Sequence, residues 1–80
     1  MAKPIYGLIG RVNIPDKPIV EEGRFECRLN IHREDDDAAI AEAKKIFGEK
    51  FSRLENGQSI MGYVYKDGTA IHTFPEVKKE

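Results

Sequence analysis

The chain contains three kinds of residue that could take part in catalysis or metal binding: one cysteine, two histidines and an acidic run. Cys27 is the single thiol, the histidines are residues 32 and 72, and residues 34–37 read Glu-Asp-Asp-Asp. A nucleophilic cysteine needs a histidine within hydrogen-bonding reach. Alternation of apolar and polar residues over 25–32 puts Cys27 on the face opposite His32. We therefore expect no catalytic residues and no enzyme.

The histidines and the acidic run do not match a metal site. Their spacing fits no structural zinc pattern, and the run lacks the glycine and the spaced oxygen ligands of a calcium-binding loop. The acids suit the start of a helix better, because carboxylates there cap free N–H groups and interact favourably with the helix dipole. We expect no metal and no cofactor.

The composition limits the class of partner. The 80 residues make one small domain, 1–80, with 13 basic and 14 acidic residues and a net charge of −1. Binding to a phosphate backbone draws on Lys and Arg, so the even balance does not favour non-specific nucleic-acid binding. The first ten residues fit neither a secretory signal nor a membrane-spanning helix. We expect a cytoplasmic protein without membrane contact.

Two strands are expected in the first half of the chain, at residues 5–14 and 25–32, because apolar residues alternate with others there. Gly7 and Gly10 indicate curvature or the close approach of another backbone. The connection at 15–23 contains two prolines and closes on a glycine, which predicts a loop.

An amphipathic helix is expected over about residues 35–55, where apolar residues recur three or four positions apart. Asp35 or Asp36 can cap its first turn. Gly48 in its interior costs about 1 kcal/mol relative to alanine. We expect this glycine to let the helix approach a neighbouring element closely.

A hairpin is expected at residues 59–74, because Asp67-Gly68 is a strong two-residue turn signal. Pro75 is expected to end the last strand, and residues 76–80 to form a flexible tail. The order of elements predicts an α+β fold. This is a two-layer ββαββ arrangement, an antiparallel four-stranded sheet with one amphipathic helix packed on one face.

The hairpin is apolar on both faces. Counting pairs outward from the turn places Tyr63 opposite His72 and Met61 opposite Phe74, and opposed residues share a face. The other face carries an aliphatic set, Ile60, Val64 and Ile71. This set brings no hydroxyl or imidazole to satisfy, so we expect its face to pack against the helix. The alternative buries the aromatic face and exposes the aliphatic one.

The aromatic face is the expected binding surface, because tyrosine and histidine combine an apolar body with a polar tip and large exposed apolar patches mark interfaces. Its candidate residues are Arg28, His32, Met61, Tyr63, Tyr65, His72 and Phe74. We expect a protein partner together with self-association as a homodimer, or either of them alone, and a role as an adaptor or inhibitor. Two alternatives stay open: single-stranded nucleic acid on the same aromatic side chains, and cover of this face by the tail or the loop at 15–23.

Overall fold

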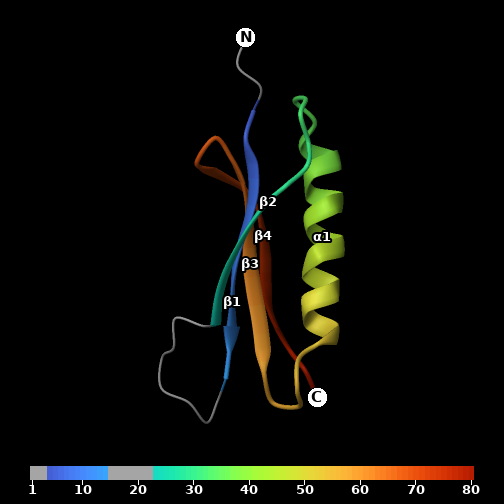
Figure 1. Cartoon of the computed structure of the whole chain (residues 1–80). Coiled ribbons are helices and arrows are strands. Elements are labelled where there is room, and N and C mark those ends of the chain that lie inside the picture. Colours follow the sequence, from blue (N-terminus) through green and yellow to red (C-terminus); the bar gives the residue numbers. More distant parts are fainter. Residues whose placement is uncertain (1–3, 15–22) are drawn as a thin grey trace.

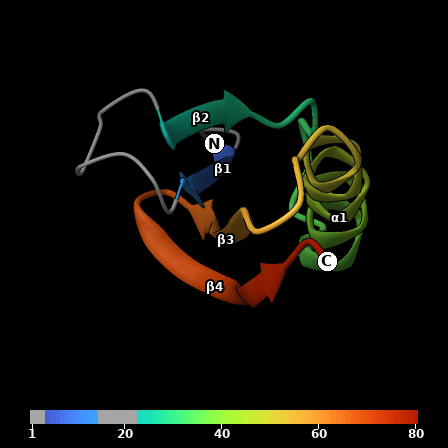
Figure 2. The same cartoon turned by 90° about the horizontal axis from the view of Figure 1, so that it is seen from below.

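The structure is a computed structural model, and it describes residues 4–14 and 23–80. Most of the loop predicted at 15–23 therefore lies outside the described residues. The elements are β1 (Tyr6–Asn13), β2 (Arg24–Arg28), α1 (Asp36–Ser52), β3 (Ser59–Lys66) and β4 (Thr69–Lys78). The strands form one antiparallel sheet in the order β2-β1-β3-β4, and α1 packs against one face of it (Figure 1 and Figure 2). The predicted α+β fold is confirmed.

The start of α1 is set by an aspartate cap. Asp35 lies just before the helix, and its Oδ1 accepts a hydrogen bond from the backbone N–H of Ala38 at 3.0 Å. The helix ends before the predicted residue 55. The N–H groups of Arg53 and Leu54 donate to carbonyl oxygens three residues earlier in the chain, which is the 3₁₀ pattern common at the end of an α-helix. Within the described part of the chain, no helix is long and apolar enough to cross a membrane.

The close approach of α1 to the sheet does not use Gly48, contrary to the prediction. A Cβ added at Gly48 would meet nothing within 4 Å, because this residue is on the exposed side of the helix. The buried residues of α1 are Ala39, Ala43 and Phe47. Two small alanine side chains therefore bring the helix close to the sheet, and Phe47 fills the space beyond them.

The strand predicted at 25–32 is longer than β2. Leu29 keeps one sheet-like bond, from its N–H to the carbonyl oxygen of Tyr6 at 2.9 Å. At the next residue the backbone turns toward the helix, because the N–H of Asn30 donates to the Glu42 carboxylate at 3.0 Å. The end of the predicted strand thus forms the connection to α1.

Asp67-Gly68 forms the predicted turn. Its residues have φ angles of 50° and 84°, as a type I′ turn requires at both central positions. The turn is also tied to the residue before β1. Ile5 donates its N–H to Oδ1 of Asp67, and its carbonyl oxygen accepts the N–H of Asp67, both at 2.9 Å.

The register between β3 and β4 departs from the prediction after the first two pairs. Ile71 is an extra residue in β4, so Val64 pairs with His72 and Gly62 pairs with Phe74. The predicted partners of His72 and Phe74, each one position earlier in β3, are wrong. A bulge of one residue moves the side chains beyond it to the opposite face, and alternation along a sequence does not reveal it.

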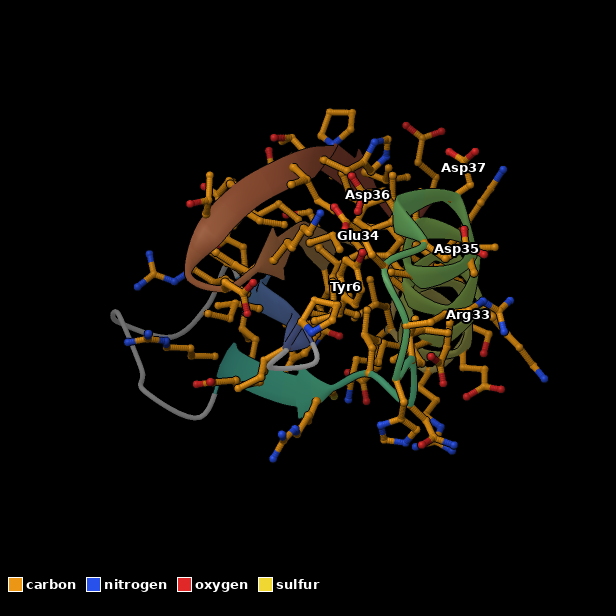
Figure 3. The ribbon with its side chains drawn as sticks, turned by 90° about the horizontal axis from the view of Figure 1, so that it is seen from above. Tyr6, Arg33, Glu34, Asp35, Asp36 and Asp37 are labelled. Carbon is orange, nitrogen blue, oxygen red and sulfur yellow. The ribbon has the colours of Figure 1, made fainter. Side chains whose placement is uncertain are left out.

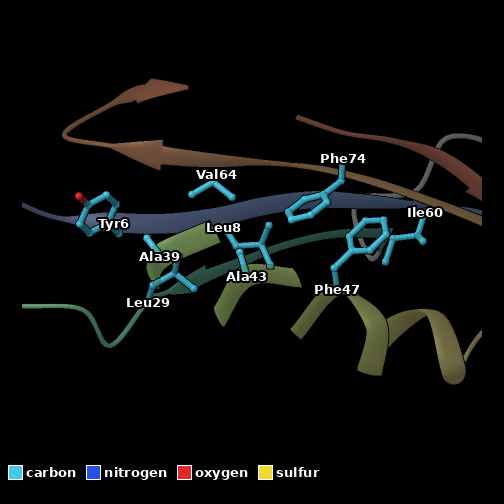
Figure 4. Close-up of a cluster of buried hydrophobic side chains, with 9 residues drawn as sticks. All are labelled: Tyr6, Leu8, Leu29, Ala39, Ala43, Phe47, Ile60, Val64 and Phe74. Atoms are coloured by element: carbon cyan, nitrogen blue, oxygen red, sulfur yellow. The ribbon is translucent and has the colours of Figure 1, made fainter. Parts of the chain in front are cut away.

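Phe74 consequently belongs to the core. Its side chain is 8 % exposed, and its ring stacks on that of Phe47 with 4.8 Å between centroids. Ile60 and Val64 are completely buried beside it, as predicted for the aliphatic face, whereas Ile71 is only half-buried. Figure 4 shows the core, which consists of Tyr6, Leu8, Leu29, Ala39, Ala43, Phe47, Ile60, Val64 and Phe74.

The prediction that Pro75 ends the last strand is also wrong. β4 continues to Lys78, and Val77 pairs with Ile60, so most of the predicted tail at 76–80 is strand. A second shift of register surrounds Pro75. β4 is an edge strand, and a proline without an N–H is tolerated at an edge or in a bulge.

Candidate binding surface

The sheet face away from α1 is the candidate binding surface and is called the outer face below (Figure 2). Its side chains form three rows across the sheet, since opposed residues point to the same side. The rows are Arg24, Arg11 and Met61, then Glu26, Ile9, Tyr63 and Thr73, then Arg28, Gly7, Tyr65 and Ala70. The pair lying between the second and third rows, Leu8 and Val64, is completely buried on the helix side.

The centre of the outer face is apolar and half-buried. Ile9, Met61, Tyr63 and Tyr65 all have intermediate exposure. The rings of the two tyrosines meet edge to face, with centroids 6.1 Å apart and an interplanar angle of 63°. The helix lies on the other side of the sheet (Figure 2).

Two open hollows adjoin each other on the outer face. One has a volume of about 330 Å³ and lies between the arginines of the first row and Tyr63. The other, of about 290 Å³, lies over Gly7, where the missing side chain leaves space beside Tyr65. Ile9 and Tyr65 line both hollows, so the two hollows are neighbours on the outer face.

Positive charge dominates the β1–β2 side of the outer face. Three arginines, residues 11, 24 and 28, are exposed there against one exposed acid, Glu26. Arg11 and Arg24 are direct cross-strand partners, an arrangement that is unfavourable for like charges. In the part of the chain that the structure describes, no carboxylate forms an ion pair with any of the three.

The structure places part of the predicted site together. The predicted residues that lie on the outer face are Arg28, Met61, Tyr63 and Tyr65. Phe74 is in the core for the reason given above. His72 is exposed, but it shares the helix side of the sheet with Phe74, and the two rings meet edge to face at 4.9 Å.

His32 is also separated from the outer face. It lies in the connection between β2 and α1, with its Nε2 2.7 Å from Oδ1 of Asn30. Sequence reasoning left Arg11 and Arg24 out of the site. The alternating pattern already places Arg11 outward, but its pairing with Arg24 depends on β1 lying between β2 and β3, which local patterns do not give.

A cluster of polar side chains lies where α1 begins (Figure 3). Tyr6 is 1 % exposed, and its hydroxyl donates to Oδ1 of Asp36 at 2.6 Å and accepts the backbone N–H of Asp35 at 3.1 Å. Nζ of Lys66 lies 2.6 Å from Oε1 of Glu34 and 3.4 Å from Oδ1 of Asp36.

These contacts shift the acid–base behaviour of the cluster. Burial, and then the bond to Asp36, raise the pKa of Tyr6. The Tyr6 hydroxyl, more than the charge of Lys66, lowers the pKa of Asp36. The bond to Glu34 raises the pKa of Lys66. Because these side chains contact one another across three elements, the cluster joins the start of the helix to β1 and β3.

Cys27 is half-buried on the helix side of β2, where it pairs with Leu8. Among the described residues, no three His, Cys, Asp or Glu side chains are arranged to hold a metal ion. No family model, curated protein or solved structure matches this chain. Its function is therefore inferred from its geometry and chemistry.

Proposed function

We propose that this protein is a small non-enzymatic binding module, of the adaptor or inhibitor type, that contacts a partner protein through the outer face. One observation carries the proposal: the half-buried apolar centre lies on a sheet face whose opposite side is already packed against the helix. A domain with one core gains nothing from a second apolar face unless another surface covers it.

The composition of the outer face also suits a protein interface. Such interfaces have an apolar centre with a polar rim, and Tyr, Met and Arg are enriched in them. Here Tyr63, Tyr65 and Met61 belong to the centre, and the three arginines lie on the β1–β2 side of it. Tyrosine tolerates both water and burial, so the face can stay soluble when free and become dry when bound.

The test is capture of partners from the native host's lysate after nuclease treatment. Tyr63→Ala with Tyr65→Ala should lose the captured protein, because tyrosines near the centre of an interface are enriched among the residues whose truncation costs about 2 kcal/mol or more of binding free energy. Lys44→Ala with Lys45→Ala, on the exposed side of α1, is the matched control and should retain it. Circular dichroism should be unchanged in both variants. Capture that survives loss of the tyrosines would refute the proposal.

Single-stranded nucleic acid is the second candidate partner, since tyrosines and arginines share the outer face and such proteins combine stacking with cationic side chains. It predicts that labelled oligothymidine binds with a strong salt dependence and that Arg11→Ala weakens this binding. Fluorescence anisotropy measures both. Absence of binding at low salt would remove this candidate.

A further inference from the structure

Arg11 and Arg24 form a like-charged pair on the outer face. Directly opposed side chains of an antiparallel pair have Cβ atoms about 5 Å apart, so their like charges repel. Both side chains are exposed, and the described residues supply no carboxylate to either. A carboxylate from another molecule would relieve this repulsion, because arginine binds carboxylates with good geometry.

The arginine pair borders the larger hollow of the outer face. Arg11 and Arg24 line it together with Ile9, Gly10, Met61, Tyr63 and Tyr65. Its volume of about 330 Å³ is sufficient for one apolar side chain. Charged and apolar contacts are therefore available within one depression.

Resting on the proposed function, we infer that the partner protein presents an acidic segment carrying an apolar anchor. Its carboxylates bind the arginine pair, and its apolar side chain enters the hollow beside Tyr63. Among the described residues, this face carries three arginines against one glutamate, and this excess of positive charge supplies the complementarity.

Nucleic acid fits this face less well. A phosphate backbone is bound by many cationic side chains along a track, whereas the outer face carries three arginines beside an acidic Glu26. The two tyrosine rings meet at 63°, so they do not offer two parallel platforms to successive bases.

A second copy of the chain fits less well too. Two outer faces stacked with their β2 strands over each other would bring three arginines of one copy against three of the other. Like charges across an interface lower affinity and slow association. An acidic segment from a different protein avoids this cost.

Random peptides displayed on phage are the probe for this inference. Selection against the wild-type protein should enrich peptides that combine Asp or Glu with an aromatic or aliphatic residue. Arg11→Glu with Arg24→Glu replaces one like-charged pair with another, so repulsion within the fold stays similar. Lys44→Glu with Lys45→Glu changes the net charge equally at the exposed side of α1 and is the matched control.

The enriched peptide, synthesised and labelled, should bind the arginine variant at least about tenfold more weakly than the wild type, and bind the lysine variant normally. Tyr63→Ala should weaken it as well, and salt should weaken it for the wild type. Backbone NMR spectra should confirm that each variant is folded. If Arg11→Glu with Arg24→Glu does not fold, the same comparison is made with Arg11→Gln and Arg24→Gln.

The other outcomes separate the two proposals. Peptides that lack acidic residues but depend on Tyr63 would overturn the acidic-segment inference and leave the proposed function standing. Peptide binding that neither the arginine nor the tyrosine variants weaken would overturn both. Enrichment of no peptide, or tighter binding of oligothymidine than of any peptide, would also overturn the inference.

Discussion

Phe74 and Tyr63 belong to the same hairpin, but their side chains lie on opposite faces of the sheet. Phe74 is 8 % exposed and stacks on Phe47 at 4.8 Å, so it stabilises the fold. Tyr63 is half-buried on the outer face, where its environment is partly water. Burial of an aromatic ring contributes to folding in proportion to the area removed from water. The two side chains should therefore differ in what their removal does.

Truncating Phe74 should be costly. Phe74→Ala is expected to lower the free energy of unfolding by about 3–5 kcal/mol, the usual cost of removing a core aromatic residue. Tyr63→Ala should lower it by about 1 kcal/mol or less and should affect binding instead. Urea unfolding followed by circular dichroism measures both variants. Equal destabilisation would contradict the assignment of Phe74 to the core and Tyr63 to the binding surface.

Arg11→Glu should stabilise the fold while it weakens binding. It replaces a like-charged cross-strand pair with an attractive one opposite Arg24, which is worth about 0.2–1 kcal/mol. The urea midpoint should rise at low salt, and the gain should shrink at high salt. Lys44→Glu, on the exposed side of α1, is the control and should stay within about 0.5 kcal/mol of the wild type. A fall in the midpoint for Arg11→Glu would show that Arg11 has a favourable contact.

The bond from Tyr6 to Asp36 makes stability depend on acid pH. The pKa values of Asp35 and Asp36 lie below their ordinary value of 3.8 in the folded state. Their contribution is therefore complete above the ordinary pKa and is lost as pH falls below it, toward the folded values. Tyr6→Phe removes the main cause for Asp36, so the pKa of Asp36 should move back toward 3.8.

Titration of the carboxyl carbons by NMR measures this shift. Asp35 is the internal control, because its pKa is lowered mainly by the Ala38 N–H, which Tyr6→Phe does not remove. The variant should also lose less stability between neutral and acid pH than the wild type. An unchanged titration of Asp36 in Tyr6→Phe would show that the hydroxyl does not set its pKa.

The helix and the turn were predictable because the residues that determine them are close together in the sequence. Asp35 caps the helix with its own carboxylate, and Asp67-Gly68 adopts the positive φ angles that its residue types favour. The register of β4 was not predictable. The bulge at Ile71 directs Phe74 onto Phe47, which belongs to another element. No residue next to Ile71 in the sequence indicates this bulge.

Helix α1 offers a site for stabilisation. Gly48 lies in its interior on the exposed side, and a Cβ there meets nothing within 4 Å. Gly48→Ala should raise the free energy of unfolding by about 0.5–1 kcal/mol, because alanine has less backbone entropy to lose. Gly10→Ala is the contrasting variant and should destabilise, since its Cβ would lie 2.2 Å from the Phe25 ring. Thermal unfolding measures both changes, and a loss of stability in Gly48→Ala would contradict the open environment of this glycine.

The order of the strands in the sheet determines which side chains lie together on the outer face. β1 lies between β2 and β3, and this brings Arg24, Arg11 and Met61 into one row from three separate segments. Alternation within each segment shows which side chains share a face of their own strand. It does not show which strands are neighbours, so the common face of Met61, Tyr63 and Tyr65 was predictable from the sequence and the arginine pair was not.

We expect the charge of the outer face to oppose self-association. We expect the wild type to be monomeric by light scattering at about 0.01 M salt, where charges act over about 30 Å. Arg11→Glu with Arg24→Glu leaves one arginine among three acidic residues, which reverses the excess charge of the face. An equimolar mixture of wild type and this variant should associate at least about tenfold more tightly than either alone. Salt at about 1 M should abolish the difference, because it screens charges beyond about 3 Å. A wild-type dimer at low salt would show instead that the apolar centre overcomes the repulsion and that a second copy is the partner.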